Sequence, residues 1–189
     1  MTTLRWGFRL EYATLAWNVV GIAVLVVAAL AARSVALAGF GLDSLIEIGA
    51  SVVVIWELSG TGAHRQRRAL RLIGTAFGLL GLYLLGQSTI VLVTGFHPRP
   101  SPAGIAWTAA TVVVMLALAA GKRAVGRALR NPVLLTEARV TVVDGLLAGA
   151  VLLGLLLNAG PGWWWADPLA GYVLVGYAVR EFVFTIRDL

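Results

Sequence analysis

The sequence predicts an all-α membrane protein, with six transmembrane helices forming one bundle over residues 1–189. Three observations predict this fold. Hydrophobic residues make up 59% of the chain and charged residues only 13%. The apolar residues form long runs, and most basic residues fall between those runs. Because a spanning helix needs about 20 mainly apolar residues, the chain has room for six helices and almost no soluble domain.

Gly, Pro, Arg and Asn residues separate the apolar runs and so delimit the spans. Pro98, Pro100 and Pro102 stiffen the connection between the third and fourth spans. Tryptophans at 163–165 open the sixth span, where amphipathic rings favour the headgroup zone. The predicted spans are 12–32, 35–58, 69–95, 104–120, 133–158 and 163–184.

The basic residues predict the orientation. If the N-terminus is cytoplasmic, thirteen of the 15 Lys and Arg residues fall on the cytoplasmic side, and only Arg33 and Arg99 lie outside. By the positive-inside rule, we expect both termini to be cytoplasmic. We also expect the protein to lie in the cell inner (plasma) membrane. The basic clusters then face anionic lipid, which argues against a nucleic-acid surface. The thirteen are Arg5, Arg9, Arg65, Arg67, Arg68, Arg71, Lys122, Arg123, Arg127, Arg130, Arg139, Arg180 and Arg187.

Three carboxylates lie deep inside the apolar runs: Asp43 and Glu47 in the second, and Asp144 in the fifth. A charge at the bilayer centre costs at least ~2.5–3.5 kcal/mol, so such residues usually have a function. Asp43 and Glu47 are four residues apart and share a helix face. Glu47 and Asp144 each lie about eleven residues from the inner end of their span, so we expect them to meet, with Asp43 one turn farther out.

With no Lys, Arg or His expected in the centre of a span, protons or a metal cation must balance these charges. The chain has no cysteine, which excludes thiolate ligands and disulfides. The alternative is that the acids are protonated and form hydrogen bonds between helices that only help the helices to pack. This alternative is less favoured, because three acids lie at matched depth.

Four further polar residues have two interpretations each. Glu137 lies two turns from Asp144 and can guide cations or hold a proton. The favoured interpretation is that it is a solvated acid at the helix end, paired with a loop arginine. The same two interpretations apply to Glu11, at the inner start of the first span. Asn18 and Thr141 are auxiliary candidates for the cation site, either as neutral oxygen ligands or as interhelical hydrogen-bonding groups.

Small residues form two stripes typical of close helix packing. One comprises Gly74, Gly78 and Gly81 in the third span, and the other comprises Gly145 and Gly149 in the fifth. Such stripes are common in membrane helices, so neither identifies the helix that packs against it.

The segment Gly41–Ser51, GLDSLIEIGAS, resembles the second transmembrane helix of the cation diffusion facilitator family. Ser34, the six spans, Asp144 and the Ala166-Asp167-Pro168 motif fit the same pattern. The resemblance covers the family's transmembrane part alone, because the sequence ends before the family's cytoplasmic C-terminal domain. It implies a cation-efflux-type bundle that exchanges a divalent metal for protons by alternating access.

The resemblance also implies a tetrahedral metal site, built from two residues four apart on each of the second and fifth helices. Asp43, Glu47 and Asp144 match three of these ligands. The fourth position is Val140, which cannot coordinate a metal. Such an oxygen-only site suits manganese, magnesium or ferrous iron better than zinc.

We therefore expect a secondary transporter that exports a divalent metal such as Mn, Fe or Zn in exchange for protons. It is expected to be no enzyme and to need no cofactor. The family commonly dimerises, so the resemblance also implies a homodimer. Two alternatives stay open: a non-transporting assembly or metal-sensing subunit, and a proton-coupled exporter of organic cations.

Overall fold

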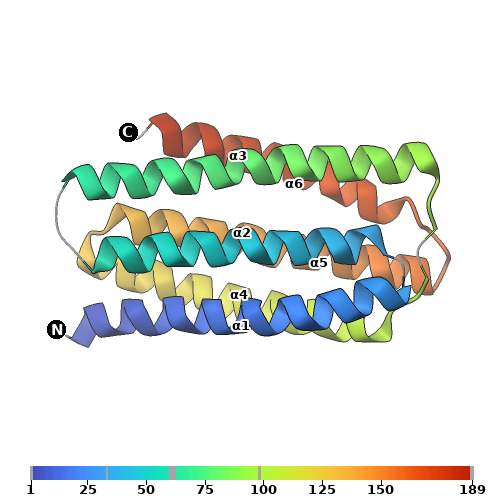
Figure 1. Ribbon diagram of the computed structural model, residues 1–189, viewed down its shortest axis with the longest axis horizontal. Helices are drawn as coiled ribbons and strands as arrows, with labels where there is room; N and C mark the ends of the chain where they lie inside the picture. Colours follow the sequence, from blue (N-terminus) through green and yellow to red (C-terminus); the bar gives the residue numbers. More distant parts are fainter. Residues whose placement is uncertain (1, 33, 60–62, 98, 188–189) are drawn as a thin grey trace.

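The computed structural model describes residues 2–32, 34–59, 63–97 and 99–187, and these residues form six α-helices (Figure 1). The all-α prediction is therefore confirmed. The helices are α1 (Thr2–Ala32), α2 (Val35–Leu58), α3 (Ala63–Thr94), α4 (Pro102–Leu129), α5 (Pro132–Ala159) and α6 (Ala166–Arg187).

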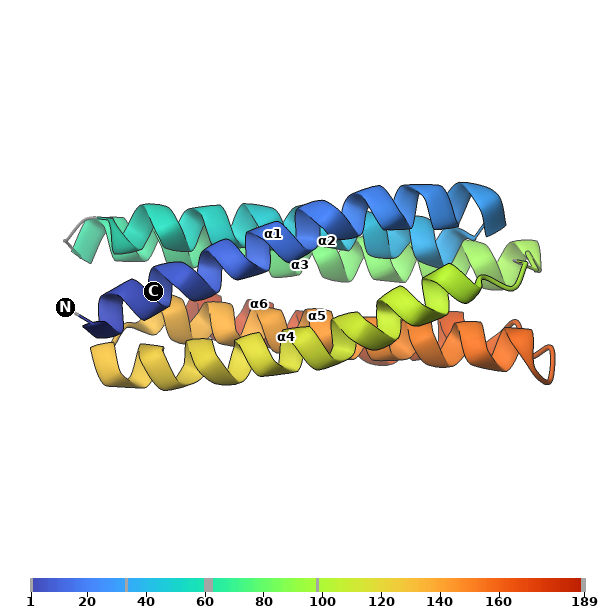
Figure 2. The same ribbon diagram turned by 90° about the horizontal axis from the view of Figure 1, so that it is seen from below.

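The helices pack as a group of four and a pair. α1 contacts α2 and α4, while α5 contacts both α2 and α4. α3 and α6 contact each other and pack against the α2–α5 side of this group (Figure 1). Figure 2 gives the view from the side of α1 and α4. α5, which also contacts α3 and α6, is the central helix of the bundle.

Consecutive helices run in opposite directions, so α1 begins and α6 ends at the same end of the bundle (Figure 1). α3 and α5 also begin there, and α2 and α4 end there. We call this the basic end, because twelve of the thirteen residues predicted to be cytoplasmic lie on these helix ends, and the last, Arg130, follows α4 directly. Arg99 belongs to the connection at the opposite end, and Arg33 lies outside the described residues.

Side-chain caps explain where α4 and α5 begin. The Ser101 hydroxyl accepts a hydrogen bond from the Gly104 N–H at 3.1 Å, and the Asn131 side chain accepts one from Leu134 at 2.9 Å. In both cases a proline follows the cap at the first helical position, where its missing N–H costs nothing. The sequence therefore specifies both starts locally.

α4 is longer than the predicted span 104–120, because it continues to Leu129. The extra segment, GKRAVGRAL, ends the apolar run without ending the helix, since Ala, Arg, Lys and Leu all favour helix. The helix stops only at Arg130, which has a left-handed backbone with φ of 50°. α1 likewise begins at Thr2, ahead of the predicted span.

Five helices are long and apolar enough to cross a membrane, which makes the chain a multi-pass membrane protein. Within the described residues α6 is not among them, so the sixth span, 163–184, stays a prediction. The five candidate spans are Thr3–Ala32, Ala36–Leu58, Arg67–Thr94, Pro102–Leu129 and Pro132–Ala159.

Both glycine stripes lie at helix contacts. A Cβ placed on Gly78 would be 3.2 Å from the Phe182 ring, and one on Gly81 would be 3.6 Å from Ala178. The first stripe therefore packs against α6. A Cβ on Gly145 would be 3.3 Å from Met115, so the second stripe packs against α4.

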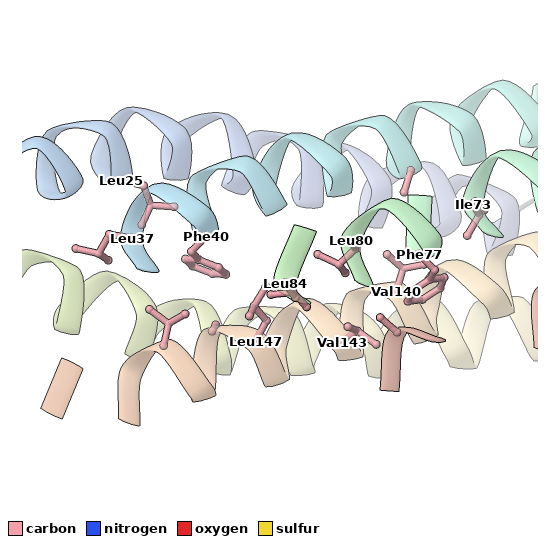
Figure 3. Packing of buried hydrophobic residues seen from close by; sticks show 14 of the residues in the cluster. Leu25, Leu37, Phe40, Ile73, Phe77, Leu80, Leu84, Val140, Val143 and Leu147 are labelled. Carbon is pink, nitrogen blue, oxygen red and sulfur yellow. The ribbon is translucent and has the colours of Figure 1, made fainter. Parts of the chain in front are cut away.

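The buried side of α5 has an apolar face and a polar face. Val140, Val143 and Leu147 belong to the main hydrophobic cluster, together with Phe77 and Leu80 of α3 (Figure 3). The polar side chains of α5 lie on the neighbouring face. The apolar face fixes α5 against the rest of the bundle and so positions the polar one.

Candidate cation site

Polar side chains pair across the contact between α2 and α5 in three steps. On α2 they recur every four residues, and on α5 they recur every three or four, so each set forms a stripe on one helix face. Because the helices are antiparallel, the stripes meet as a ladder. From the opposite end to the basic end, its rungs are Asp43 with Asp144, Glu47 with Thr141, and Ser51 with Glu137.

The outermost rung consists of two carboxyl groups. Asp43 and Asp144 are both buried, and their carboxyl groups lie within hydrogen-bonding reach of each other. Among the described residues, no donor reaches Oδ2 of Asp43 or either oxygen of Asp144. Carboxylates only accept hydrogen bonds, so such a pair needs a proton or a cation between its members.

The middle rung joins Glu47 to a hydroxyl group. The Thr141 hydroxyl donates a 2.8 Å hydrogen bond to Glu47 Oε1. The other oxygen, Oε2, has no donor among the described residues. The register differs by one turn from the expected one, because Asp43 rather than Glu47 meets Asp144. Counting residues from assumed span ends was not accurate enough to fix this register.

A fully buried lysine lies beside the two inner rungs. Lys122 Nζ of α4 is 2.9 Å from Glu137 Oε1 and 3.1 Å from Glu11 Oε2. It also donates to the Thr141 hydroxyl at 3.0 Å, and it lies 3.9 Å from Glu47 Oε1. We call Lys122, Glu11 and Glu137 the lysine cluster. It joins α1, α4 and α5 in the interior of the bundle.

The lysine cluster corrects three expectations. Lys122 was expected in a cytoplasmic loop, but it is a buried helical residue within the fourth span. The expectation that only protons or a metal cation balance the buried acids is wrong, because Lys122 supplies part of the counter-charge. Glu137 and Glu11 are fully buried and paired with Lys122, so they are not solvated helix-end acids.

A periodic signal in the sequence could have revealed Lys122. The buried residues of α4 recur every three or four positions, which is the spacing of one helix face, and Lys122 continues that series. Arg123 and Arg127 lie off this face and are exposed. The buried positions are Gly104, Thr108, Thr111, Met115, Ala119, Lys122 and Gly126.

Neither Asn18 nor Val140 contributes to the ladder. Asn18 is buried, and its amide donates to the Thr14 carbonyl of its own helix at 3.1 Å, not to another helix. Val140 lies in the apolar cluster (Figure 3), and the residue that reaches Glu47 from α5 is its neighbour Thr141. As the side chains stand, no three Asp, Glu or His residues within the described ranges converge closely enough to hold one metal ion.

A small hollow is lined by residues of α2, α3 and α5 about one helical turn from Asp43 and Asp144, toward the opposite end, and neither aspartate lines it. Its volume is about 50 Å³, which is room for water. It is lined by Phe40 and Leu147, each three residues from one of the aspartates, and by Gln87 and Ser88 of α3. A partly polar space therefore lies about one helical turn beyond the outermost rung.

Thr141 is predicted to connect the ladder to the lysine cluster. Thr141→Val should lower the stability of the folded protein by about 1–3 kcal/mol, because it removes the hydroxyl that donates to Glu47 and one of the three acceptors of Lys122. Thermal unfolding of the purified protein in detergent measures this. Thr108→Val is the matched control, since Thr108 is equally buried but bonds only carbonyls of its own helix. An equal loss in both variants would contradict the connecting role.

Comparison with known proteins finds a distant similarity to a membrane protein. No protein-family model matches the sequence. Transmembrane protein 163 of Xenopus laevis is 22% identical to it over 188 residues, a match that covers 93% of this chain. The chain is a distant relative of transmembrane protein 163. The match spans 66% of transmembrane protein 163, just under two thirds of its length.

Proposed function

We propose that this chain is a secondary transporter, similar to the cation diffusion facilitators, that exports a divalent metal in exchange for protons. The observation that carries the proposal is the set of buried carboxylates on α2 and α5, Asp43, Glu47 and Asp144. Each has at least one oxygen that no donor satisfies among the described residues. Cation binding would satisfy these oxygens.

The balance of charge supports a cation as the cargo. Five buried carboxyl groups, those of the ladder together with Glu11, share the interior with a single buried lysine in the described part of the chain, and three of them lie within 4 Å of its ammonium. If all ionised, they would carry a net charge of −4 in a low-dielectric interior, which cannot persist without protons or metal. The atoms proposed to bind the metal are all oxygens, and an all-oxygen site favours manganese or ferrous iron over zinc.

Exchange with protons follows from the same ligands. A carboxylate must be deprotonated to bind a metal, so each metal that enters displaces protons and each proton that binds weakens the metal's hold. In this proposal no covalent chemistry and no cofactor are involved. Asp43 and Asp144 hold the cargo, and Glu47 joins them by turning from Thr141.

The proposed setting is the inner (plasma) membrane, with the basic end in the cytoplasm. Both termini then lie inside, and the small hollow lined by Phe40 and Leu147 lies toward the external side. A homodimer, as in the similar family, is part of the proposal.

A second candidate is a non-transporting membrane subunit. The lysine cluster favours it, because Lys122 already balances part of the acidic charge and joins three helices. On this reading the acids serve assembly only.

Transport by purified protein distinguishes the candidates. In liposomes with an imposed proton gradient, we expect Mn²⁺ flux against the proton flow, detected by an internal metal indicator, and no flux in protein-free liposomes. Absence of flux for Mn²⁺, Fe²⁺, Co²⁺ and Zn²⁺ would contradict the transporter and favour the subunit. Proton-driven movement of an organic cation dye without metal flux would indicate an organic-cation exporter instead.

A further inference from the structure

We propose that Lys122 is a tethered cation that competes with the transported metal for Glu47 and thereby sets the affinity of the metal site. This inference rests on the proposed function. It assigns the buried lysine a role in positioning Glu47, in addition to its part in holding helices together.

The surroundings of Lys122 Nζ are those of a cation site. Oxygens from three residues lie at 2.9–3.1 Å: carboxylates of Glu137 and Glu11, and the Thr141 hydroxyl. The residues that supply these oxygens come from α1 and α5, and the ammonium reaches them from α4. The ammonium group thus fills a pocket of oxygens in the way that a small metal ion would.

Glu47 is the carboxylate that belongs to both sites. Its Oε1 lies 3.9 Å from the Lys122 ammonium and accepts from Thr141, which in turn accepts from Lys122. Its Oε2 has no donor among the described residues. Lys122 therefore attracts Glu47 toward the basic end, away from Asp43 and Asp144.

Metal binding and the lysine must oppose each other. A divalent ion held by Asp43, Asp144 and Glu47 would lie close to the ammonium, and like charges repel strongly in a poorly screened interior. Glu11 and Glu137 moderate this conflict, because they give the ammonium an alternative to Glu47. A site built this way holds its cargo loosely enough to release it.

A pair of variants that differ only at Lys122 tests the inference. In Glu11→Gln/Glu137→Gln the ammonium has only Glu47 left as a charged partner, so affinity for Mn²⁺ should fall about tenfold. Adding Lys122→Met to that double variant removes the competitor, so affinity should rise about tenfold above wild type. Isothermal titration of Mn²⁺ into monodisperse, helical protein gives both values.

The outcomes separate this inference from the proposed function. If wild-type protein binds no metal, the proposed function itself fails. If wild type binds metal but the double and triple variants share one affinity, Lys122 is only structural and the inference is wrong. Loss of affinity in both variants would overturn it as well.

A different observation carries a second inference. We propose that a groove between α4, α5 and α6 near the basic end binds the phosphate of an anionic phospholipid. Four arginines from three helices line it: Arg123 and Arg127 of α4, Arg139 of α5 and Arg180 of α6. The groove has a volume of about 650 Å³, and none of the described residues that line it is acidic.

The apolar floor of the groove suits the acyl chains of a phospholipid. Small and apolar residues, among them Leu116, Ala119 and Val142, line it beside the arginines. A phospholipid has the same pattern, with an anionic group at the interface and acyl chains below it. Basic pockets between membrane helices on the cytoplasmic side commonly bind such headgroups.

Native mass spectrometry with a charge-matched control tests the groove. Wild type should retain phosphatidylglycerol or cardiolipin at least about tenfold more strongly than phosphatidylcholine. The variant with all four groove arginines changed to Gln should lose this preference. The control with Arg5, Arg9, Arg67 and Arg68 changed to Gln, which are exposed and lie outside the groove, should keep it.

Three results would overturn the lipid assignment. Equal loss in both quadruple variants would mean that general surface charge is responsible. Full competition by inorganic phosphate alone would indicate a free-anion site. Loss of a dimer in the groove variant, with lipid preference unchanged, would assign the groove to a second copy of the chain.

Discussion

Replacing Asp144 by Asn should abolish metal flux in proteoliposomes, and Asp43→Asn and Glu47→Gln should do the same. Each change keeps the size of the side chain but removes a charge that the proposed site uses to bind a divalent cation. The expected loss is at least about a hundredfold, since each variant removes one of only three charged ligands. Initial rates of Mn²⁺ uptake at matched protein density measure it.

Glu57→Gln is the matched control for these variants. Glu57 is also a buried acid of α2, but it lies near the basic end and accepts a 3.0 Å hydrogen bond from Asn131, outside the ladder. Its variant should retain most of the flux. Normal transport by any two of the three ladder variants would contradict the site assignment. Loss of flux in Glu57→Gln, with flux retained in the ladder variants, would contradict it as well.

The largest effect on stability is expected for Lys122→Met. This change leaves Glu11 and Glu137 buried without their counter-charge, and breaking a buried ion pair from one side costs about 3–5 kcal/mol. The purified variant should show a markedly lower Tm in detergent, or fail to accumulate in the membrane.

Two comparisons make the Lys122 prediction specific. Arg68→Met removes an exposed charge at the basic end, outside both the lysine cluster and the arginine groove, and should change Tm very little. Adding Glu11→Gln and Glu137→Gln to Lys122→Met should restore Tm, because no uncompensated charge then remains in the cluster. A stable single variant, or a triple variant as unstable as the single one, would contradict the ion-pair account.

Hydropathy predicted the positions of the helices well, because a helix that crosses a bilayer needs a long run of apolar side chains. The runs that contain Asp43 and Asp144 are long and apolar, so both residues were expected to be buried, and they are. Hydropathy does not show where a helix ends, however. For this reason α4 was predicted to stop before Lys122, although the series from Thr108 to Gly126 continues through it on one face.

The same limit explains the errors in the site. Charge at the end of an apolar run usually indicates solvent, and so Glu11 and Glu137 were expected to be solvated helix-end acids and Lys122 a loop residue. Their burial depends on one another, because each acid needs the lysine and the lysine needs the acids. The contacts of α4 with α1 and with α5 bring them together, and no local pattern within one helix specifies that.

The register of the ladder, that is, which residue of α2 faces which residue of α5, likewise could not be predicted from the sequence. The four-residue spacing of Asp43 and Glu47 predicts a shared face, but not which of the two meets Asp144. Side-chain packing decides this, including the contact of Val143 and Leu147 with the apolar cluster on the adjacent face of α5 (Figure 3).

Titration of purified protein with Mn²⁺, Fe²⁺, Co²⁺ and Zn²⁺ in weak buffer tests the central claim most directly. We expect about one ion bound per chain, with protons released as metal binds and with affinity that weakens as pH falls, since both compete for the same carboxylates. We also expect no binding by the Asp43→Asn/Asp144→Asn double variant. Absence of binding to wild type, or binding of equal affinity to the double variant, would contradict a cation site between α2 and α5.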